Sequence, residues 1–317
     1  MTAMPQFGWI NDPAAVGRVL EALRRQGHDP VFASAARHLM QLAGDQDVFF
    51  WELEKQVLGR VLDAWDQGQL GDCVGNGGGR TAQNCLLATI AAKIPADDGR
   101  PEAWPGAEVA VEPAYAGSRE MSGISGFSDG STGAGMAKWF VDYGVIVRGV
   151  YGRWDFIHYS TQTAKELGAR AVPDDLKTVA RQHPVKTVAV TQTADEVWAA
   201  LGAWKPVCIC GSISRTMKRQ PGGWCPKTGN NWPHCHTLVG RCTVKGGQRA
   251  VVYLNSWGDY LGPDNNHVVL ESGREVDLPM GCYLSRLEEI ESDLQQGDTF
   301  AYSNAHGWPA QSFSWYL

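Results

Sequence analysis

A cysteine, a glutamine and two later residues carry the side chains that thiol-dependent hydrolysis of an amide requires. Cys73 lies between a glycine-rich turn and an alanine-rich segment that is typical of a buried helix. The amide groups at the start of such a helix would lower the pKa of a thiol. Gln67 precedes Cys73 by six residues, and its side-chain amide could bind a developing oxyanion together with the backbone N–H of Cys73. The sequence therefore predicts a nucleophile beside an oxyanion site.

A base and a residue that could orient it follow much later in the chain. His234 opens the segment HCHTLVG, for which we predict a strand, and Asn255 ends the apolar run VVYL within LNSWG. Asn255 would orient the imidazole through its side-chain carbonyl group. His236 is the alternative base, and it would share one strand face with His234 because side chains alternate with period two.

The order Gln, Cys, His and Asn-Ser-Trp-Gly resembles that of the papain-like cysteine peptidases. The cysteine segment of that family has the form Gln-Gly-x-x-Gly-x-Cys, which is matched here by Gln67, Gly68, Gly71 and Cys73. The segments GMAKWFVDYGV and VKTVAVTQTADEVWAALGAWKPVCICGSI also resemble parts of the family's two lobes. The resemblance covers residues 66–283 and implies a papain-like fold.

The same resemblance assigns expected roles to further residues. The family's histidine segment has a glycine six positions after the histidine, and His234 with Gly240 satisfies that count, which favours His234 over His236. Trp257 matches the tryptophan that shields the Asn–His hydrogen bond, although a plain core role is the alternative for Trp257. Gly130 and Ser131 align with the glycine pair that binds the substrate backbone.

Helical patterns in the first half and β-prone runs in the second predict an α+β architecture. Together with the resemblance, this α+β pattern predicts a two-lobed fold. We expect an N-terminal helical extension over residues 1–50, a helical left lobe carrying the nucleophile over 51–184, and a β-rich right lobe carrying His234 and Asn255 over 185–317. The extension, with helices after Pro13 and from about residue 30 to 43, is interpreted as a packing layer; an inhibitory pro-segment is the alternative.

Two stretches of the left lobe are rich in glycine and need separate interpretation. Residues 95–133 are rich in Pro, Gly and Ser, and they read as loop. The triple glycine Gly77–Gly79 follows Cys73 closely, and each glycine inside a helix costs about 1 kcal/mol relative to alanine. The helix therefore either starts late or packs its first turns tightly against other backbone.

Composition narrows the remaining function classes. A formal net charge of -6 without a run of like charges argues against a nucleic-acid partner. No apolar run approaches membrane-spanning length and no signal sequence is recognised, so we expect a cytoplasmic protein without membrane contact, whose eight cysteines are free thiols. Cys225, Cys235 and His236 match no common zinc spacing, so we expect no metal and no organic cofactor.

The predicted function is hydrolysis of peptide bonds in a peptide or protein substrate through an acyl-thioester intermediate. The alternative is a weakly active or inactive papain-like fold that serves as a binding or structural component of a larger assembly such as a virus particle. Val74, where the family usually has tryptophan, and the triple glycine favour this alternative. The N-terminal extension and the aromatic C-terminal tail, residues 308–317, would then contact the assembly partner.

Overall fold

Helices dominate the first half of the chain in the computed structural model, which describes residues 7–42, 44–92 and 108–305. The expected helix after Asp12 is confirmed as α1, with the Asp12 side chain accepting from the Ala15 backbone N–H. The helices of this half are α1 (Pro13–Arg25), α2 (Phe32–Ala35), α3 (Arg37–Leu42), α4 (Phe50–Leu58), α5 (Cys73–Ala91), α6 (Val111–Ser122), α7 (Gly133–Asp142), α8 (Thr161–Gly168) and α9 (Asp174–Ala180). A small hairpin of β2 (Val150–Tyr151) and β3 (Trp154–Asp155) precedes α8.

Strands dominate the second half and form one antiparallel sheet in the order β10-β7-β6-β5-β11-β4. These strands are β4 (Val185–Val190), β5 (Val207–Ile213), β6 (Trp232–Val244), β7 (Gln248–Leu254), β10 (Cys282–Arg286) and β11 (Asp298–Ala305). A separate pair is formed by β8 (His267–Val269) and β9 (Glu275–Asp277), and helix α10 (Ala194–Gly202) connects β4 to β5. The 3-10 helix η1 (Leu287–Ile290) and α11 (Glu291–Leu294) lead into β11. The predicted α+β class is confirmed.

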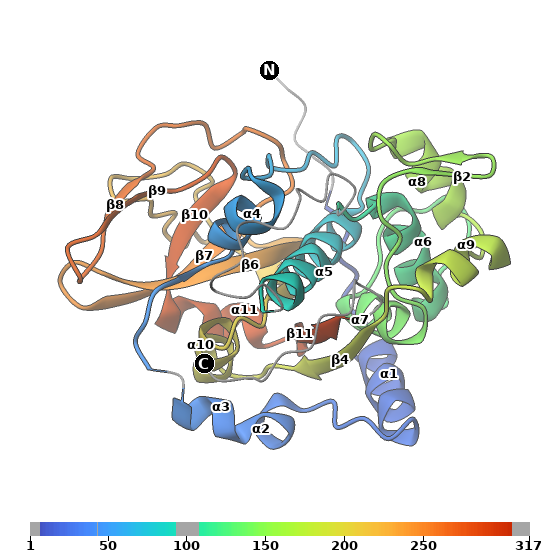
Figure 1. Ribbon diagram of the computed structural model, residues 1–317, viewed down its shortest axis with the longest axis horizontal. Coiled ribbons are helices and arrows are strands. Elements are labelled where there is room, and N and C mark those ends of the chain that lie inside the picture. Colours follow the sequence, from blue (N-terminus) through green and yellow to red (C-terminus); the bar gives the residue numbers. More distant parts are fainter. Residues whose placement is uncertain (1–6, 43, 93–107, 306–317) are drawn as a thin grey trace.

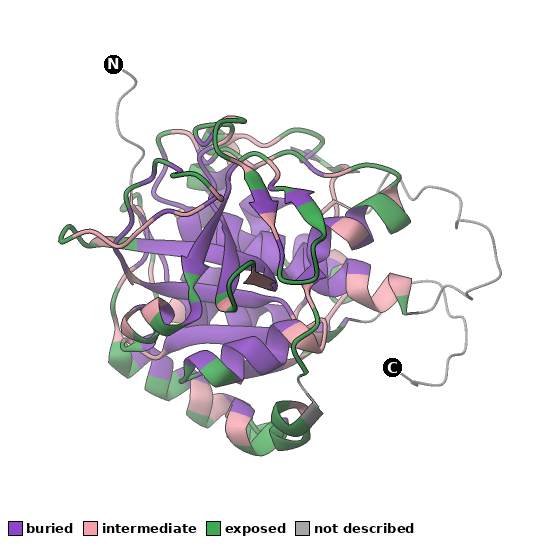
Figure 2. Cartoon of the chain, turned by 90° about the vertical axis from the view of Figure 1, so that its left-hand side faces the viewer, coloured by how far each residue is buried: buried purple, intermediate pink, exposed green. Residues whose placement is uncertain are grey.

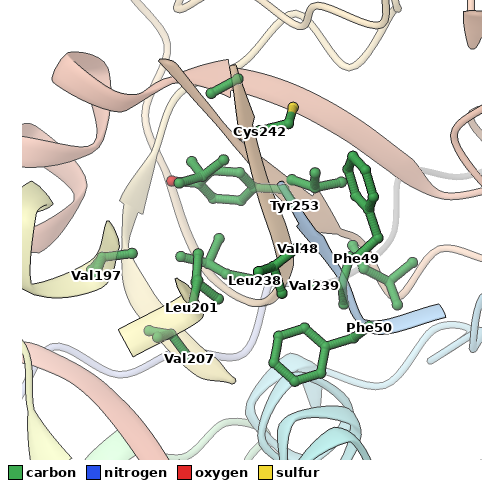
Figure 3. Close-up of a cluster of buried hydrophobic side chains, with 14 of the residues drawn as sticks. Val48, Phe49, Phe50, Val197, Leu201, Val207, Leu238, Val239, Cys242 and Tyr253 are labelled. Atoms are coloured by element: carbon green, nitrogen blue, oxygen red, sulfur yellow. The ribbon is translucent and has the colours of Figure 1, made fainter. Parts of the chain in front are cut away.

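The core of the right lobe gathers side chains from both ends of the sequence. Strand β1 (Val48–Phe49) pairs with β6 at Arg241 and Gly240. Figure 3 shows Val48, Phe49 and Phe50 packed with side chains of α10, β6 and β7. This end of the predicted N-terminal extension therefore packs on the right-lobe sheet.

Helix α5 lies between the sheet and the other helices of the left lobe (Figure 1). It begins at Cys73, so the alternative of a late start is wrong and the tight-packing alternative is confirmed. A Cβ on Gly77 would lie 2.9 Å from the Cys235 Sγ, and one on Gly75 would lie 2.7 Å from the Tyr115 Cβ. Glycine is required at these positions because neighbouring elements approach the helix axis too closely for a side chain.

Two expectations for local structure need correction, and two segments cannot be compared with the structure. Helix α6 lies inside the stretch expected to be loop, because its apolar residues are buried against α5 and α7. The single helix expected from about residue 30 to 43 is two short helices that are separated at Ala36. Residues 93–107 and the aromatic tail 308–317 lie outside the described residues.

Burial follows this layering. Figure 2 shows buried residues in the central strands, whereas the peripheral helices carry exposed and intermediate residues. In α5 the residues from Cys73 to Leu87 are buried. In the described part of the chain, no helix is long and apolar enough to cross a bilayer.

Candidate active site

The candidate nucleophile Cys73 is the first residue of α5, and its thiol is completely buried. Burial raises the pKa of this thiol to about 12, although hydrogen bonds to the backbone of Gly8 and Cys235 oppose the rise. The prediction that Cys73 is a thiolate with a low pKa is therefore wrong for the protein in the state in which this thiol is buried. The reason is that the desolvation of the thiol outweighs the effect of the helix N-terminus.

His234 and Asn255 are paired by a hydrogen bond of 2.9 Å between the imidazole Nε2 and the Asn255 Oδ1. His234 lies on β6, and Asn255 directly follows β7, which is the neighbouring strand. The Ser256 backbone N–H also donates to Asn255 Oδ1 at 2.8 Å, which fixes the orientation of the amide. Burial lowers the pKa of His234 to about 4, so the imidazole is neutral at pH 7. Its Nδ1 has no hydrogen-bond partner among the described residues.

Aromatic side chains enclose the imidazole of His234. The Trp257 ring lies 5.0 Å from it, centroid to centroid, at an interplanar angle of 30°. His236 meets it edge-on at 4.5 Å, and the Nε2 of His236 lies 3.4 Å from the Tyr283 hydroxyl. His236 is thus a buried neighbour of the candidate base, whereas His234 is the histidine that donates to Asn255 Oδ1.

Gln67 connects the loop before Cys73 to the loop that contains Asn255. Its Oε1 accepts a hydrogen bond of 2.7 Å from the Ser256 hydroxyl, and its Nε2 donates to the Leu70 carbonyl group at 2.8 Å. The Gln67 backbone N–H donates to the Ser256 carbonyl group at 2.9 Å. The side-chain amide is therefore held in one orientation close to the start of α5.

Gly130 and Ser131 contact a backbone segment, and that segment is the protein's own N-terminal stretch Phe7–Ile10, here named the cleft segment. The Ser131 N–H donates to the Gly8 carbonyl group and the Ile10 N–H donates to the Ser131 carbonyl group, each at 2.8 Å. This pairing is a parallel bridge of Trp9 with Ser131. A peptide backbone thus occupies the place that was expected for substrate.

The cleft segment covers the candidate catalytic residues with two aromatic side chains. The Phe7 ring stacks on Trp232 at 5.8 Å and meets the His234 imidazole edge-on at 5.9 Å. The Trp9 Nε1 donates to Asp298 Oδ2 at 2.7 Å in a buried contact. Together with Gly8, which hydrogen-bonds the Cys73 thiol, these side chains close the site to solvent.

Two buried carboxyl groups near the site were not predicted from the sequence. Asp298 accepts hydrogen bonds from the backbone of Gly133 and Ala134 in addition to Trp9, and burial raises its pKa to about 6. Asp72 precedes Cys73 and accepts from the Tyr159 hydroxyl at 2.6 Å; burial raises its pKa well above the ordinary value. Adjacency to Cys73 was a usable signal for Asp72, whereas no local pattern marks Asp298.

Comparisons with known proteins place this geometry in a fold family. No family model and no curated protein matches the sequence. Xylellain, a cysteine protease from Xylella fastidiosa, matches the structure with a TM-score of 0.54 and 16% identity over 84% of this chain and 88% of that chain. Digestive procathepsin L 3 from Tenebrio molitor matches with a TM-score of 0.52 and 12% identity over 92% of this chain and 89% of that chain. ProCathepsin B S9 from Trypanosoma congolense matches with a TM-score of 0.54 and 9% identity over 85% of this chain and 80% of that chain.

These structures share one architecture with the chain across most of both lengths, although few residues are identical. The chain therefore has the papain-like fold that these cysteine proteases share.

Proposed function

We propose that the protein is a thiol-dependent peptidase that hydrolyses peptide bonds through an acyl-thioester intermediate. The observation that carries this proposal is the His234–Asn255 hydrogen bond at one side of a site whose other side binds an extended peptide backbone. An orienting amide on Nε2 leaves Nδ1 of the imidazole to accept a proton from a thiol. A peptide or protein is the substrate class that such a site fits.

In the proposed reaction, His234 Nδ1 takes the proton of the Cys73 thiol as the sulfur attacks the carbonyl carbon of the scissile bond. The Cys73 backbone N–H and the Gln67 side-chain amide stabilise the negative oxygen that forms. His234 then returns the proton to the leaving amine, and the acyl group remains on Cys73. Water, deprotonated by the same imidazole, hydrolyses the thioester and restores the thiol.

The cleft segment must leave before a substrate can bind, so we assign an inhibitory role to it. Ser131 can pair with only one backbone at a time, and Phe7 lies over His234. The burial of Cys73 and His234 favours the neutral thiol and the neutral imidazole, and both pKa shifts should shrink when water enters.

The free, buried state of all eight cysteines supports the cytoplasm as the compartment.

A thiol-directed epoxide analogue of a peptide tests the proposal. It should label Cys73 once the cleft segment is displaced, and Cys73→Ala should abolish the labelling. Cys85→Ala is the matched control, because Cys85 is buried in the same helix but lies away from its start. Labelling spread over several cysteines, or an opened protein that cleaves no peptide, would favour the alternative of a structural component in a larger assembly.

A further inference from the structure

Three cysteines converge in the interior between the sheet and the helices of the left lobe. Cys208 and Cys210 lie on β5 and Cys235 lies on β6, opposite Cys210 in the antiparallel register. Their sulfur atoms are 2.7 Å apart for Cys210 and Cys235, 3.3 Å for Cys208 and Cys235, and 4.0 Å for Cys208 and Cys210. All three residues are buried. We call them the thiol cluster.

The surrounding chain leaves space for these sulfur atoms and for little else. A Cβ on Gly77 of α5 would lie 2.9 Å from the Cys235 Sγ, and one on Gly133 of α7 would lie 3.0 Å from the Cys210 Sγ. Two helices therefore approach the thiol cluster at positions where each has only a hydrogen atom as side chain. Tyr302 lies on the adjacent strand β11, and its hydroxyl group is near the Cys208 thiol.

A metal ion could reach all three sulfur atoms, and tetrahedral zinc–thiolate bonds of about 2.3 Å would require the Cys210–Cys235 separation to widen from 2.7 Å to about 3.8 Å. The three sulfur atoms form a triangle whose corners are about 2.0 Å from its centre, so a point about 1.1 Å above the plane lies about 2.3 Å from each, the length of a zinc–thiolate bond. Among the described residues, no other group of three His, Cys, Asp or Glu side chains brings its ligand atoms this close.

We propose that Cys208, Cys210 and Cys235 bind a thiophilic metal ion, Zn²⁺ or Cu⁺, as thiolates. Soft sulfur ligands select these two ions over Mg²⁺ or Ca²⁺. Three thiols lose their protons to solvent as the ion binds, and three metal–sulfur bonds form without oxidation or reduction. Cu⁺ would be held by the three sulfur atoms, whereas Zn²⁺ would recruit the Tyr302 hydroxyl as its fourth ligand.

The ion would join two strands of the sheet beside the candidate catalytic residues. Cys235 follows His234 directly on β6 and contacts Gly77 of α5, the helix that begins at Cys73. An ion on the thiol cluster would fix β6 against β5 below this contact. The site is structural, and it stands whether or not the protein cleaves peptides.

Metal content tests the proposal on the full chain. The protein is produced with Zn²⁺ or with Cu⁺, purified under reducing conditions and analysed by elemental mass spectrometry, which also distinguishes the two ions. We expect one ion per chain in the wild type. Cys208→Ser and Cys235→Ser should lower the affinity by more than the roughly 10- to 100-fold that losing an outer-shell partner costs. Cys242→Ser is the matched control, because Cys242 is equally buried on β6 but outside the thiol cluster.

A spectroscopic measurement on the wild type covers the case in which the serine variants do not fold. Co²⁺ bound by thiolates gives a sulfur-to-metal charge-transfer band, and Zn²⁺ should displace Co²⁺ and raise the melting temperature. A wild-type protein that shows no charge-transfer band, holds no ion after production with either metal and melts at the same temperature with and without it would overturn the proposal. So would a metal content that falls equally in Cys242→Ser and Cys235→Ser.

Discussion

Gly8 lies so close to the backbone of Gly71 that a Cβ on Gly8 would overlap the Gly71 carbonyl group. Both backbones are held from other sides. The Gly8 carbonyl group accepts from the Ser131 N–H, and the Gly71 N–H donates to Asp129 Oδ2 at 3.1 Å. The contact between the two glycines therefore determines how deeply the cleft segment lies over Cys73.

Gly8→Ala should expel the cleft segment, because the added methyl group has no space beside Gly71. Alkylation of Cys73 by iodoacetamide at neutral pH should become about tenfold faster or more, measured on the Cys73 peptide by mass spectrometry. Gly17→Ala in α1 is the matched control, since nothing lies within 4 Å of a Cβ at Gly17. An unchanged alkylation rate in Gly8→Ala would show that this segment does not protect the thiol.

The pH dependence of the same reaction should shift between the two forms. The thiolate fraction grows as the pH rises through the thiol pKa, and burial raises this pKa to about 12 when Cys73 is covered. Wild-type Cys73 should therefore stay unreactive well above neutral pH. In Gly8→Ala the midpoint should fall to about 8.5 or below, because water and the imidazole become available. A rate profile with the same midpoint in both proteins would contradict the role of burial.

Substitutions made in the Gly8→Ala background should show how much each candidate catalytic group contributes to peptide cleavage. Cys73→Ala should abolish peptide cleavage and His234→Ala should come close, because the thiolate depends on the imidazole. Gln67→Ala should lower kcat by about 10²- to 10³-fold, because the backbone N–H of Cys73 remains as an oxyanion donor. Asn255→Ala should be milder, because it orients a base that the thiolate already attracts.

The two histidines on β6 should differ sharply in the same assay. His236→Gln should keep most of the activity, because His234, and not His236, donates the hydrogen bond to Asn255 Oδ1. The kcat of purified, folded protein is the measurement. Full activity in His234→Ala with none in His236→Gln would reverse the assignment of the base.

The glycines at the start of α5 should respond differently to alanine. Gly77→Ala should lower the free energy of unfolding by about 1–3 kcal/mol, because the methyl group would press on the side chain and backbone of Cys235. Gly79→Ala should be neutral or stabilising by up to about 1 kcal/mol, because only the half-buried Trp65 ring must shift and helix propensity improves. Urea denaturation measures both, and equal effects would contradict the tight packing of the first turns.

A buried ion pair joins α5 to α4, and its loss should be costly. Arg80 donates to Glu54 at 2.6 Å, and both side chains are almost fully buried. Arg80→Met should lower the free energy of unfolding by about 3–5 kcal/mol, because it leaves the Glu54 carboxylate buried without its cation. Arg249→Met removes the exposed pair with Asp45 and should cost less than about 1 kcal/mol. A similar loss of unfolding free energy in Arg80→Met and Arg249→Met, measured by thermal or urea unfolding, would contradict this prediction.

The sequence by itself determined the α+β class and the identity of the candidate catalytic residues. Gln67 and Cys73 belong to one short motif, and Asn255 and Trp257 to another, so each pair could be recognised without knowing what surrounds it. The periodicity of α1 and the cap at Asp12 were also readable locally, because helix signals depend on neighbours within a few residues.

The tertiary structure alone decided the state of the site. Burial raises the pKa of Cys73, and the backbones of Gly8 and Cys235, which are far from it in sequence, oppose the rise only in part; no local pattern reports that water is excluded. The convergence of Cys208, Cys210 and Cys235 depends on the register of β5 with β6, and the need for glycine at Gly77 depends on the sulfur atom that meets it. Burial and side-chain contacts depend on residues that are distant in the sequence, and these residues come together only when the chain is folded.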